Sequence, residues 1–277
     1  MTNDFDMEKY IEMKREEMRD LFDTLNDSTR EIAKDSEAYL RYLDVQSRFD
    51  LYSVSNSILI AKQKPEATQL KSFDDWRKLA IQIGKGEKGV QILEPYEFDK
   101  SDGSRGRGYK VKKVFDISQT NALRRRRGQG LAQRDRLKAL IENAPVEIEA
   151  VDNVEGDAAA RYYHNDGKIY VRTGSDPDVL FKETSRELAH AHFALDNDSY
   201  TREEYTDKAD TASYMLCKKY GLETTDMKPS LPERYGNMKA REIRNELNDT
   251  RRAVCDISGR MRENLKKQRE ARDNQER

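Results

Sequence analysis

Apolar residues at helical spacing recur near both ends of the chain, and this periodicity constrains the fold more than any other feature. Between residues 6 and 50 they follow one another three or four positions apart, as amphipathic helices require. Residues 26–28 interrupt the pattern, so we expect one helix to end there and another to begin. From Met238 a second periodic stretch predicts one long helix, with apolar positions at Ile243, Leu247, Val254, Ile257, Met261 and Leu265.

Alternating segments between these helical ends predict two small sheets. Residues 89–93 and 108–115 alternate apolar and polar side chains on either side of a loop rich in Gly, Ser and Asp, which indicates an antiparallel pair. Residues 161–172 enclose Asn-Asp-Gly, a strong signal for a hairpin. Helices are expected near 176–195 and 201–220. The predicted fold class is α+β, with helices on a small antiparallel sheet, a second α+β domain and a long C-terminal helix.

Changes in composition along the chain predict three regions. The run RRRRGQG at 124–130 is too charged and too rich in glycine for a core, so we place a linker or exposed loop there. The predicted boundaries are 1–135 for an N-terminal domain, 136–232 for a second domain, and 233–277 for the amphipathic C-terminal helix with its polar tail.

Several classes of protein are excluded by composition. The mean hydropathy is -1.01, and no apolar run approaches the roughly 18 residues of a membrane span. The N-terminus is acidic and amphipathic and lacks the apolar core of a secretory signal. Two isolated cysteines, Cys217 and Cys255, exclude a disulfide framework and a Cys-rich zinc module. We therefore expect a cytoplasmic protein with no membrane partner.

Charge is distributed unevenly along a chain whose net charge is only -1. Residues 1–50 contain 14 acidic and 8 basic side chains, whereas residues 100–138 contain 13 basic and 3 acidic ones. The basic segment could meet a polyanion, or it could be a solvated loop, and charge alone favours neither.

Aromatic rings and cations are interleaved between residues 52 and 127. Rings that stack on bases and cations that meet phosphates are what a single-stranded nucleic acid requires. The sequence GKGEKG at 84–89 would let the backbone approach a phosphate closely, although it is not a Walker loop. Taken singly, Phe73 and Trp76 could instead be core residues, since buried aromatic residues outnumber stacking platforms.

Residues 52–96, followed by VFDISQT at 114–120, resemble the N-terminal domain of ArdC-type antirestriction proteins. The shared positions keep their order and spacing over about 70 residues; they are Tyr52, Asn56, Gln63, Pro65, Ala67, Phe73, Trp76, Lys85, Gly86, Lys88, Gly89, Pro95 and residues 115–120. The resemblance implies non-specific binding of single-stranded DNA and carriage on a plasmid, conjugative element or phage. The candidate DNA-binding residues are Tyr52, Asn56, Phe73, Trp76, Lys85, Lys88, Phe115, Gln119, Thr120, Arg124, Arg125, Arg126 and Arg127.

A second motif, TSRELAHAH at 184–192, is similar to the HExxH helix of a zincin-like metallopeptidase, the domain with which members of this family continue. Arginine stands at 186, where the first zinc-binding histidine belongs. We therefore predict a pseudoenzyme without a cofactor, in which Glu187 is an inactive remnant of the catalytic base and His190 and Asp210 are vestigial ligands. A bidentate Arg186–Asp210 pair would replace the charge of the metal.

The leading hypothesis is a non-specific single-stranded DNA-binding protein of a mobile genetic element, with an antirestriction or DNA-protection role. Its partners would be single-stranded DNA and a host defence protein. One alternative is an active metallopeptidase that holds zinc or another divalent metal through Glu187, His190 and Asp210 and acts on a host protein. Another is a protein-interaction module whose basic loop binds an acidic partner.

Overall fold

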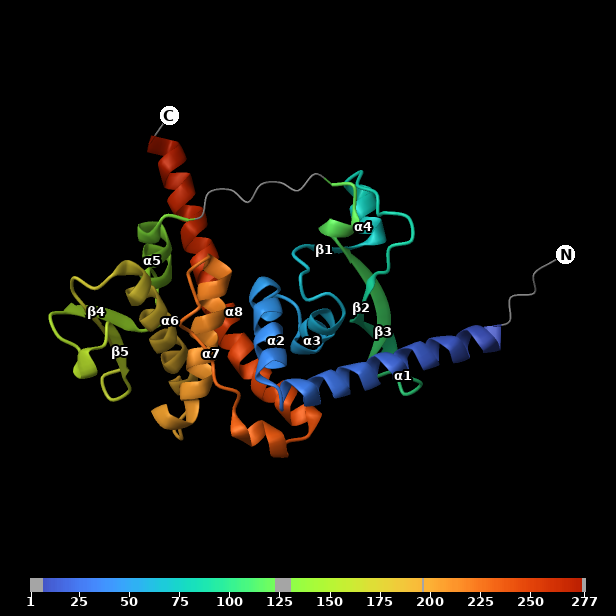
Figure 1. The fold of residues 1–277 in the computed structure, drawn as a ribbon, viewed down its shortest axis with the longest axis horizontal. Coiled ribbons are helices and arrows are strands. Elements are labelled where there is room, and N and C mark those ends of the chain that lie inside the picture. The colour runs from blue at the N-terminus through green and yellow to red at the C-terminus, as the bar shows by residue number, and fades with distance from the viewer. Residues whose placement is uncertain (1–6, 123–130, 196, 276–277) are drawn as a thin grey trace. The chain divides into compact units, whose positions relative to one another are not determined.

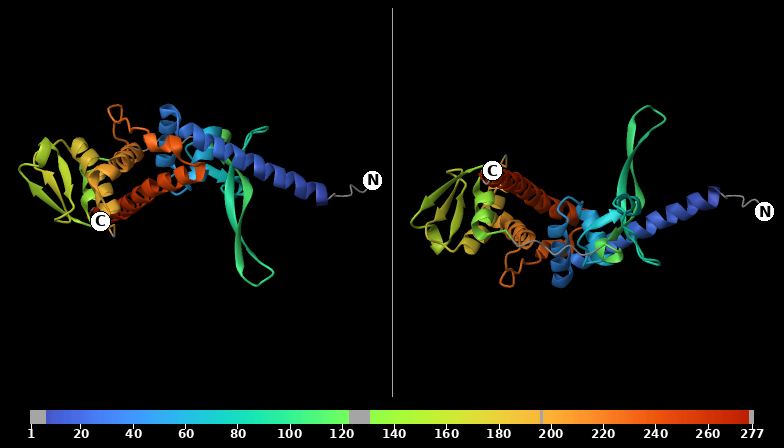
Figure 2. Two further views of the ribbon diagram at one scale, coloured as in Figure 1. Left: turned by 90° about the horizontal axis from the view of Figure 1, so that it is seen from below. Right: turned by 90° about the horizontal axis from the view of Figure 1, so that it is seen from above.

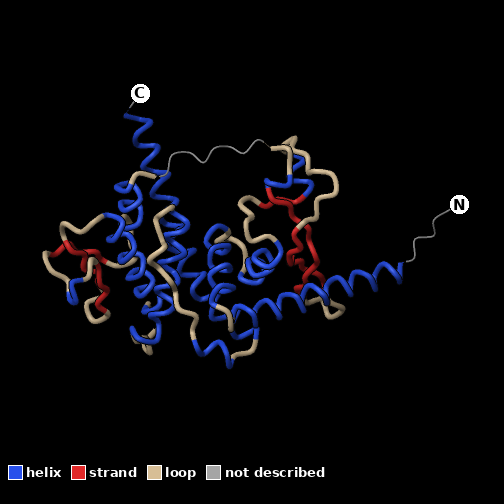
Figure 3. The backbone as a smooth tube through the Cα atoms, viewed as in Figure 1, coloured by secondary structure: helices blue, strands red, loops and turns tan. Residues whose placement is uncertain are grey.

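The computed structural model describes residues 7–122, 131–195 and 197–275, and it confirms the α+β class (Figure 1). Helices predominate, and the strands form two small sheets (Figure 3). The helices are α1 (Met7–Ile32), α2 (Ser36–Arg48), α3 (Val54–Gln63), α4 (Phe73–Lys78), α5 (Gln133–Ile141), α6 (Pro177–Ala194), α7 (Arg202–Tyr220) and α8 (Ala240–Gln275). The strands are β1 (Leu70–Ser72), β2 (Val90–Asp99), β3 (Arg105–Asp116), β4 (Glu147–Val151), β5 (Ala160–Tyr163) and β6 (Lys168–Arg172).

The chain divides into two compact units, each assembled from three segments. The first unit comprises Met1–Val45, Tyr52–Arg126 and Arg234–Arg244. The second unit comprises Gln46–Leu51, Arg127–Glu233 and Asn245–Arg277. The long C-terminal helix α8 is present as expected and contributes residues to both units. The boundaries 1–135, 136–232 and 233–277 remain a prediction.

The first unit is built on an antiparallel sheet in the order β1-β3-β2. Helix α3 is apolar around most of its circumference and is buried, with Ile58 and Leu59 fully inaccessible. Ser53 accepts a hydrogen bond from the backbone N–H of Asn56 and begins the helix. Beyond the sheet, β2 and β3 continue as a long two-stranded ribbon (Figure 2).

The expected helix boundary at 26–28 is wrong. Helix α1 continues to Ile32, because Asp27 forms an ion pair with Arg30 one turn later instead of starting a new helix. The break falls at residues 33–35. There the carboxylate of Asp35 accepts hydrogen bonds from the backbone N–H groups of Glu37 and Ala38 and thereby caps α2.

The second unit contains the sheet β4-β6-β5. The hairpin predicted at 161–172 is present as the antiparallel pair β5–β6, whereas β4 pairs with β6 in parallel. Helices α6 and α7 pack together, and α6 lies against the sheet. Gly221 ends α7 with a φ of 77°, a left-handed conformation that glycine adopts at low cost. Within the described ranges, no helix is long and apolar enough to span a membrane.

Candidate nucleic-acid interface

The lysine loop, residues 84–89, connects α4 to β2 and is held in place by Gln119. The backbone N–H of Gly84 donates to the Gln119 carbonyl oxygen over 2.9 Å. The Gln119 side-chain amide donates to the Glu87 carboxylate over 2.8 Å and to the Lys88 carbonyl over 2.9 Å. Lys85 and Lys88 are exposed, and neither has an ion-pair partner among the described residues. The loop therefore presents two ammonium groups from a fixed backbone.

Asp116 anchors the turn from which Gln119 reaches the loop. Its carboxylate accepts hydrogen bonds from the backbone N–H groups of Thr68, Gln69 and Ser118, over 2.7 to 3.0 Å. Burial by itself raises the pKa of Asp116, but the hydrogen bonds, that from Gln69 foremost, lower it below its ordinary value. The segment that carries the sequence resemblance thus acts as a scaffold for the lysine loop.

A groove of about 790 Å³ lies beside the loop and between the C-terminal end of α3 and the strands β2 and β3. Lys88 and Lys113 contribute cations to its wall, and Phe115 contributes a half-buried ring. A Cβ atom at Gly89 would come within 3.0 Å of the Phe115 ring. Glycine at this position therefore leaves the space in which the ring lies along the groove.

Three predicted DNA-binding residues are buried in the first unit: Gln119, which holds the lysine loop, Asn56 and Trp76. The Asn56 amide donates to the carbonyl oxygen of Leu93 and accepts from its N–H, over 2.9 and 2.8 Å. Trp76 is 1% exposed, and its indole N–H donates to the Phe115 carbonyl over 2.9 Å. A stacked base would find no free face on this ring, so the interface that we describe does not include Trp76 or Asn56.

The remaining candidates are dispersed. Phe73 is 55% exposed at the start of α4. Tyr52 lies with Lys112 in a separate hollow of about 350 Å³, where burial raises the pKa of the phenol. The Thr120 hydroxyl donates to the Ile117 carbonyl and closes the turn. The predicted arginine arm falls outside the described residues; it comprises Arg124, Arg125, Arg126 and Arg127.

In the second unit, Glu187 is fully buried on α6, and both oxygens of its carboxylate already accept hydrogen bonds. Arg202, the first residue of α7, binds it through two hydrogen bonds of 2.7 and 2.8 Å. The Tyr162 N–H donates to it over 2.8 Å, and Arg186 Nε donates over 3.1 Å. Burial by itself raises the pKa of Glu187, but these partners, Arg202 foremost, lower it below its ordinary value.

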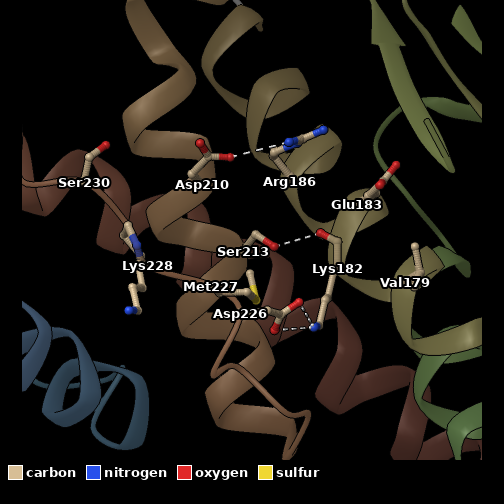
Figure 4. Close-up of a pocket in the computed structure, with 11 residues that line it drawn as sticks. Val179, Lys182, Glu183, Arg186, Asp210, Ser213, Asp226, Met227, Lys228 and Ser230 are labelled. Carbon is tan, nitrogen blue, oxygen red and sulfur yellow. Dashed lines mark hydrogen bonds and ion pairs between the residues drawn. The ribbon is translucent and has the colours of Figure 1, made fainter. Parts of the chain in front are cut away.

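Arg186 extends from α6 toward Asp210 on α7, at the wall of a pocket of about 400 Å³ (Figure 4). Its Nη1 lies 3.7 Å from Asp210 Oδ1, a single ion pair. The expected bidentate Arg186–Asp210 pair is therefore wrong, because Arg186 also contacts Glu187. The bidentate guanidinium is that of Arg202, which contacts a different carboxylate.

His190, which the sequence predicts to be a vestigial ligand, is also engaged in the structure. His190 Nδ1 lies 2.9 Å from the Tyr200 hydroxyl, and burial lowers the pKa of the imidazole from 6.5 to about 4. His192 faces another direction and contacts Asp256 at 3.3 Å. In the part of the chain that the structure describes, no group of three or more His, Cys, Asp or Glu side chains is arranged to hold a metal ion.

Carboxylates of α6 also accept hydrogen bonds from the backbone N–H groups on the outer edge of β5, the edge that does not pair with β6. The backbone N–H of Ala160 donates to Glu183 over 3.0 Å, two residues before the Tyr162 N–H that donates to Glu187. Sequence analysis missed both Glu183 and Arg202, because only the packing of α6 against β5 and α7 brings these groups together. In the local sequence, the one sign of this arrangement was Glu183 itself, which stands one helical turn before Glu187 and therefore lies on the same face of α6.

These features define the class of the molecule: an α+β protein in which one unit carries a cationic groove and the other a glutamate neutralised by arginine. Residues 15–127 match the family model of the N-terminal domain of the anti-restriction factor ArdC. The resemblance predicted from the sequence is thereby confirmed, and this segment is an ArdC-type N-terminal domain.

Two solved structures share the fold of this chain. The crystal structure of the antirestriction ArdC protein from the R388 plasmid is 19% identical in its metal-free form, with a TM-score of 0.51 over 78% of this chain and 86% of that chain. Its Mn(II)-bound form is 19% identical, with a TM-score of 0.52 over 77% and 85%. At this identity the likeness shows a shared fold.

A curated relative is the uncharacterized protein pXO2-81 of Bacillus anthracis. It is 23% identical over 79% of this chain and 46% of its own length. The chain therefore spans about half the length of the curated relative that it matches.

Proposed function

We propose that the chain binds single-stranded DNA without sequence preference and serves an antirestriction role for a mobile genetic element. The observation that carries this proposal is the groove, which combines the ring of Phe115 with the cations Lys88 and Lys113 inside a domain of the ArdC type. A ring and ammonium groups side by side suit a base and its neighbouring phosphates. An antirestriction role places the protein in the cytoplasm, where it would meet a host defence protein.

Single strands are favoured over duplex because only unpaired bases offer a free face to a ring at the wall of a groove. The lysine loop supports the same preference. Lys85 and Lys88 are exposed and unpaired among the described residues, so a phosphate meets them without breaking an internal ion pair. The alternative of an acidic protein partner uses the same cations but has no need of Phe115.

We also propose that the second unit is a metallopeptidase-like domain without activity. A divalent metal of the kind bound by the R388 relative does not fit the residues present here. Arg186 stands between Glu187 and Asp210, and Arg202 occupies both oxygens of Glu187. Two permanent cations repel a metal ion, and a carboxylate with every oxygen engaged is a poor base.

The β5 edge argues against peptidase activity independently. A peptide can extend a sheet by pairing with the free N–H groups of its edge strand. Here the N–H groups of Ala160 and Tyr162 already donate to Glu183 and Glu187. The competing hypothesis, an active site made of Glu187, His190 and Asp210, requires Glu187 to give up its contacts with Tyr162, Arg186 and Arg202.

Fluorescence anisotropy with labelled single-stranded and duplex oligonucleotides tests the DNA-binding proposal. We expect tighter binding of the single strand and a steep loss of affinity as salt is raised. Lys85→Ala with Lys88→Ala should reduce the slope of log K against log salt by about 1.4, or about 0.7 for each phosphate that is no longer neutralised. Lys34→Ala removes an exposed lysine of the turn between α1 and α2 and is the matched control. Absence of binding at low salt would favour the protein-interaction alternative.

Metal addition tests the second proposal. Because the two arginines already neutralise the carboxylates, Zn²⁺ or Mn²⁺ should leave the melting temperature of the full chain unchanged. A stoichiometric metal content after purification, or a clear rise in melting temperature with either ion, would instead support the active metallopeptidase.

A further inference from the structure

The ribbon arm, residues 94–110, extends beyond the small sheet of the first unit (Figure 2). Along this stretch β2 and β3 pair only with each other, since β1 reaches β3 only at residues 114–116. One face of the arm meets helix α1, where Phe22 contacts Tyr109 at a ring-centroid distance of 6.5 Å. The other face carries two aromatic rings, each opposite a glycine.

That other face carries two aromatic rings seated on glycines. Tyr96 lies opposite Gly108, and Phe98 lies opposite Gly106. A Cβ atom at Gly106 would come within 2.5 Å of the Phe98 ring, and one at Gly108 within 2.7 Å of the Tyr96 ring. Each ring therefore lies directly against the backbone of β3, in space that only a glycine leaves open.

Both rings remain open to solvent. Tyr96 and Phe98 are each 44% exposed, with centroids 5.9 Å apart and an angle of 43° between their planes. Cross-strand packing of the rings on the glycines stabilises the arm, but it leaves part of each ring uncovered. Two adjacent aromatic surfaces exposed away from the core indicate a binding surface.

The charges on the face of the rings favour an anionic partner. Alternation along β3 places Lys110 and Lys112 on the face of the rings, where both share the carboxylate of Glu94. On the opposite face, Arg105 and Arg107 share Glu97 at 3.7 and 3.6 Å, beyond hydrogen-bond distance. On the face of the rings one carboxylate thus serves two lysines, whereas over residues 94–112 as a whole Asp99 and Asp102 bring the acidic side chains to four against five basic ones. The Lys110 side chain is 61% exposed, so its ammonium group is accessible to a phosphate of the partner.

From this arrangement we infer that the ribbon arm is a second contact site for single-stranded DNA, with bases stacked on Tyr96 and Phe98 and a phosphate on Lys110. The inference rests on the proposed function. It adds a stacking surface that lies outside the groove, within the stretch of interleaved rings and cations at 52–127 but not among the candidate DNA-binding residues.

Stacking and charge contacts differ in their dependence on salt, and the test uses this difference. Tyr96→Leu with Phe98→Leu keeps an apolar contact on the glycines and removes the aromatic faces. We expect about tenfold weaker binding of a labelled oligonucleotide at every salt concentration, with an unchanged slope. Lys110→Ala should instead lower the slope by about 0.7. Tyr10→Leu, at an exposed aromatic residue of α1, is the matched control.

A direct readout keeps the inference testable if the leucine variant folds poorly. In Tyr96→Trp the introduced indole should be quenched when the oligonucleotide is added, while the buried Trp76 gives a constant background. Wild-type protein that fails to bind single-stranded DNA would overturn the proposed function. A different outcome would overturn only the inference about the ribbon arm: the wild type binds, the indole is not quenched, and the leucine variant keeps its affinity. The rings would then have a structural or protein-binding role.

Discussion

At the residue scale, Asn56 shows that a residue shared with the family can stabilise the fold instead of contacting DNA. Strand β2 is an edge strand, and side chains of α3 pair with its free backbone groups: Asn56 with Leu93, and Gln63 with Gln91. Two amides two helical turns apart thus take the place of a neighbouring strand. This structural role explains why Asn56 and Gln63 keep their spacing in the family resemblance, and it requires no contact with DNA.

We predict that Asn56→Ala lowers the free energy of unfolding of the first unit by about 1–3 kcal/mol, because a buried N–H and a buried carbonyl lose their partners. Gln63→Ala is the matched control, since water reaches that exposed amide and replaces its hydrogen bonds. Denaturant unfolding followed by Trp76 emission measures both variants. Equal effects of the two substitutions would mean that burial at Asn56 is unimportant.

His190 gives the second unit a pH dependence. Burial lowers the pKa of its imidazole to about 4 in the folded chain, against 6.5 as its ordinary value. Between these values the unfolded chain binds more protons than the folded one, so stability is complete above about pH 6.5 and declines as the pH falls toward 4. The loss should approach about 2 kcal/mol by about pH 5.

Thermal unfolding of the wild type and of His190→Gln across this range checks the expectation. The variant should lose the part of the slope between about pH 6.5 and about pH 4 that His190 supplies, while His192, whose pKa burial also lowers, retains a further part. His164→Gln, at the exposed tip of the β5–β6 hairpin, should retain it. An unchanged slope in His190→Gln would assign the pH dependence to other groups.

At the scale of elements, α6, α7 and β5 are joined by a glutamate that has a structural task. Glu187 connects the edge of β5 to the first turn of α7 through Tyr162 and Arg202. Glu187, which the sequence predicts to be a remnant of a catalytic base, therefore holds three elements together. Its burial follows from this role and requires no chemistry.

Arg202→Met should destabilise the second unit by about 3 kcal/mol, because it leaves a buried carboxylate with weaker compensation. Adding Glu187→Gln to Arg202→Met should recover much of the loss, since the uncompensated charge is then gone. Arg186→Gln, at a side chain that is 35% exposed, should cost less. Urea unfolding followed by circular dichroism measures the cycle. A double variant less stable than Arg202→Met would contradict the charge argument.

Local sequence signals predicted the elements better than the site. The period of the C-terminal helix and the Asn-Asp-Gly turn are encoded within a few residues, so both were found. Burial of Trp76 and capture of Glu187 by Arg202 depend on contacts between segments distant along the chain. Residue type could not distinguish a stacking ring from a core ring, or a free arginine from one bound to a buried carboxylate.

At the scale of the whole molecule, the division into two units gives each its own spectroscopic probe. Trp76 is the one tryptophan of the chain and lies in the first unit. Its emission therefore reports the unfolding of the first unit, whereas far-ultraviolet circular dichroism follows the helices of both. Helix α8 and residues 46–51 link the units through the chain, so coupled unfolding is the competing expectation.

We predict that the two probes separate on acidification. His190 lies in the second unit and loses its stabilising effect as the pH falls from about 6.5 toward 4, so the dichroism transition should gain an early component that Trp76 emission lacks. In His190→Gln the transitions should keep the same separation at both pH values. Coincident transitions in the wild type at about pH 5 would mean that the units unfold as one cooperative body, and the effect of His190 would then reach Trp76 as well.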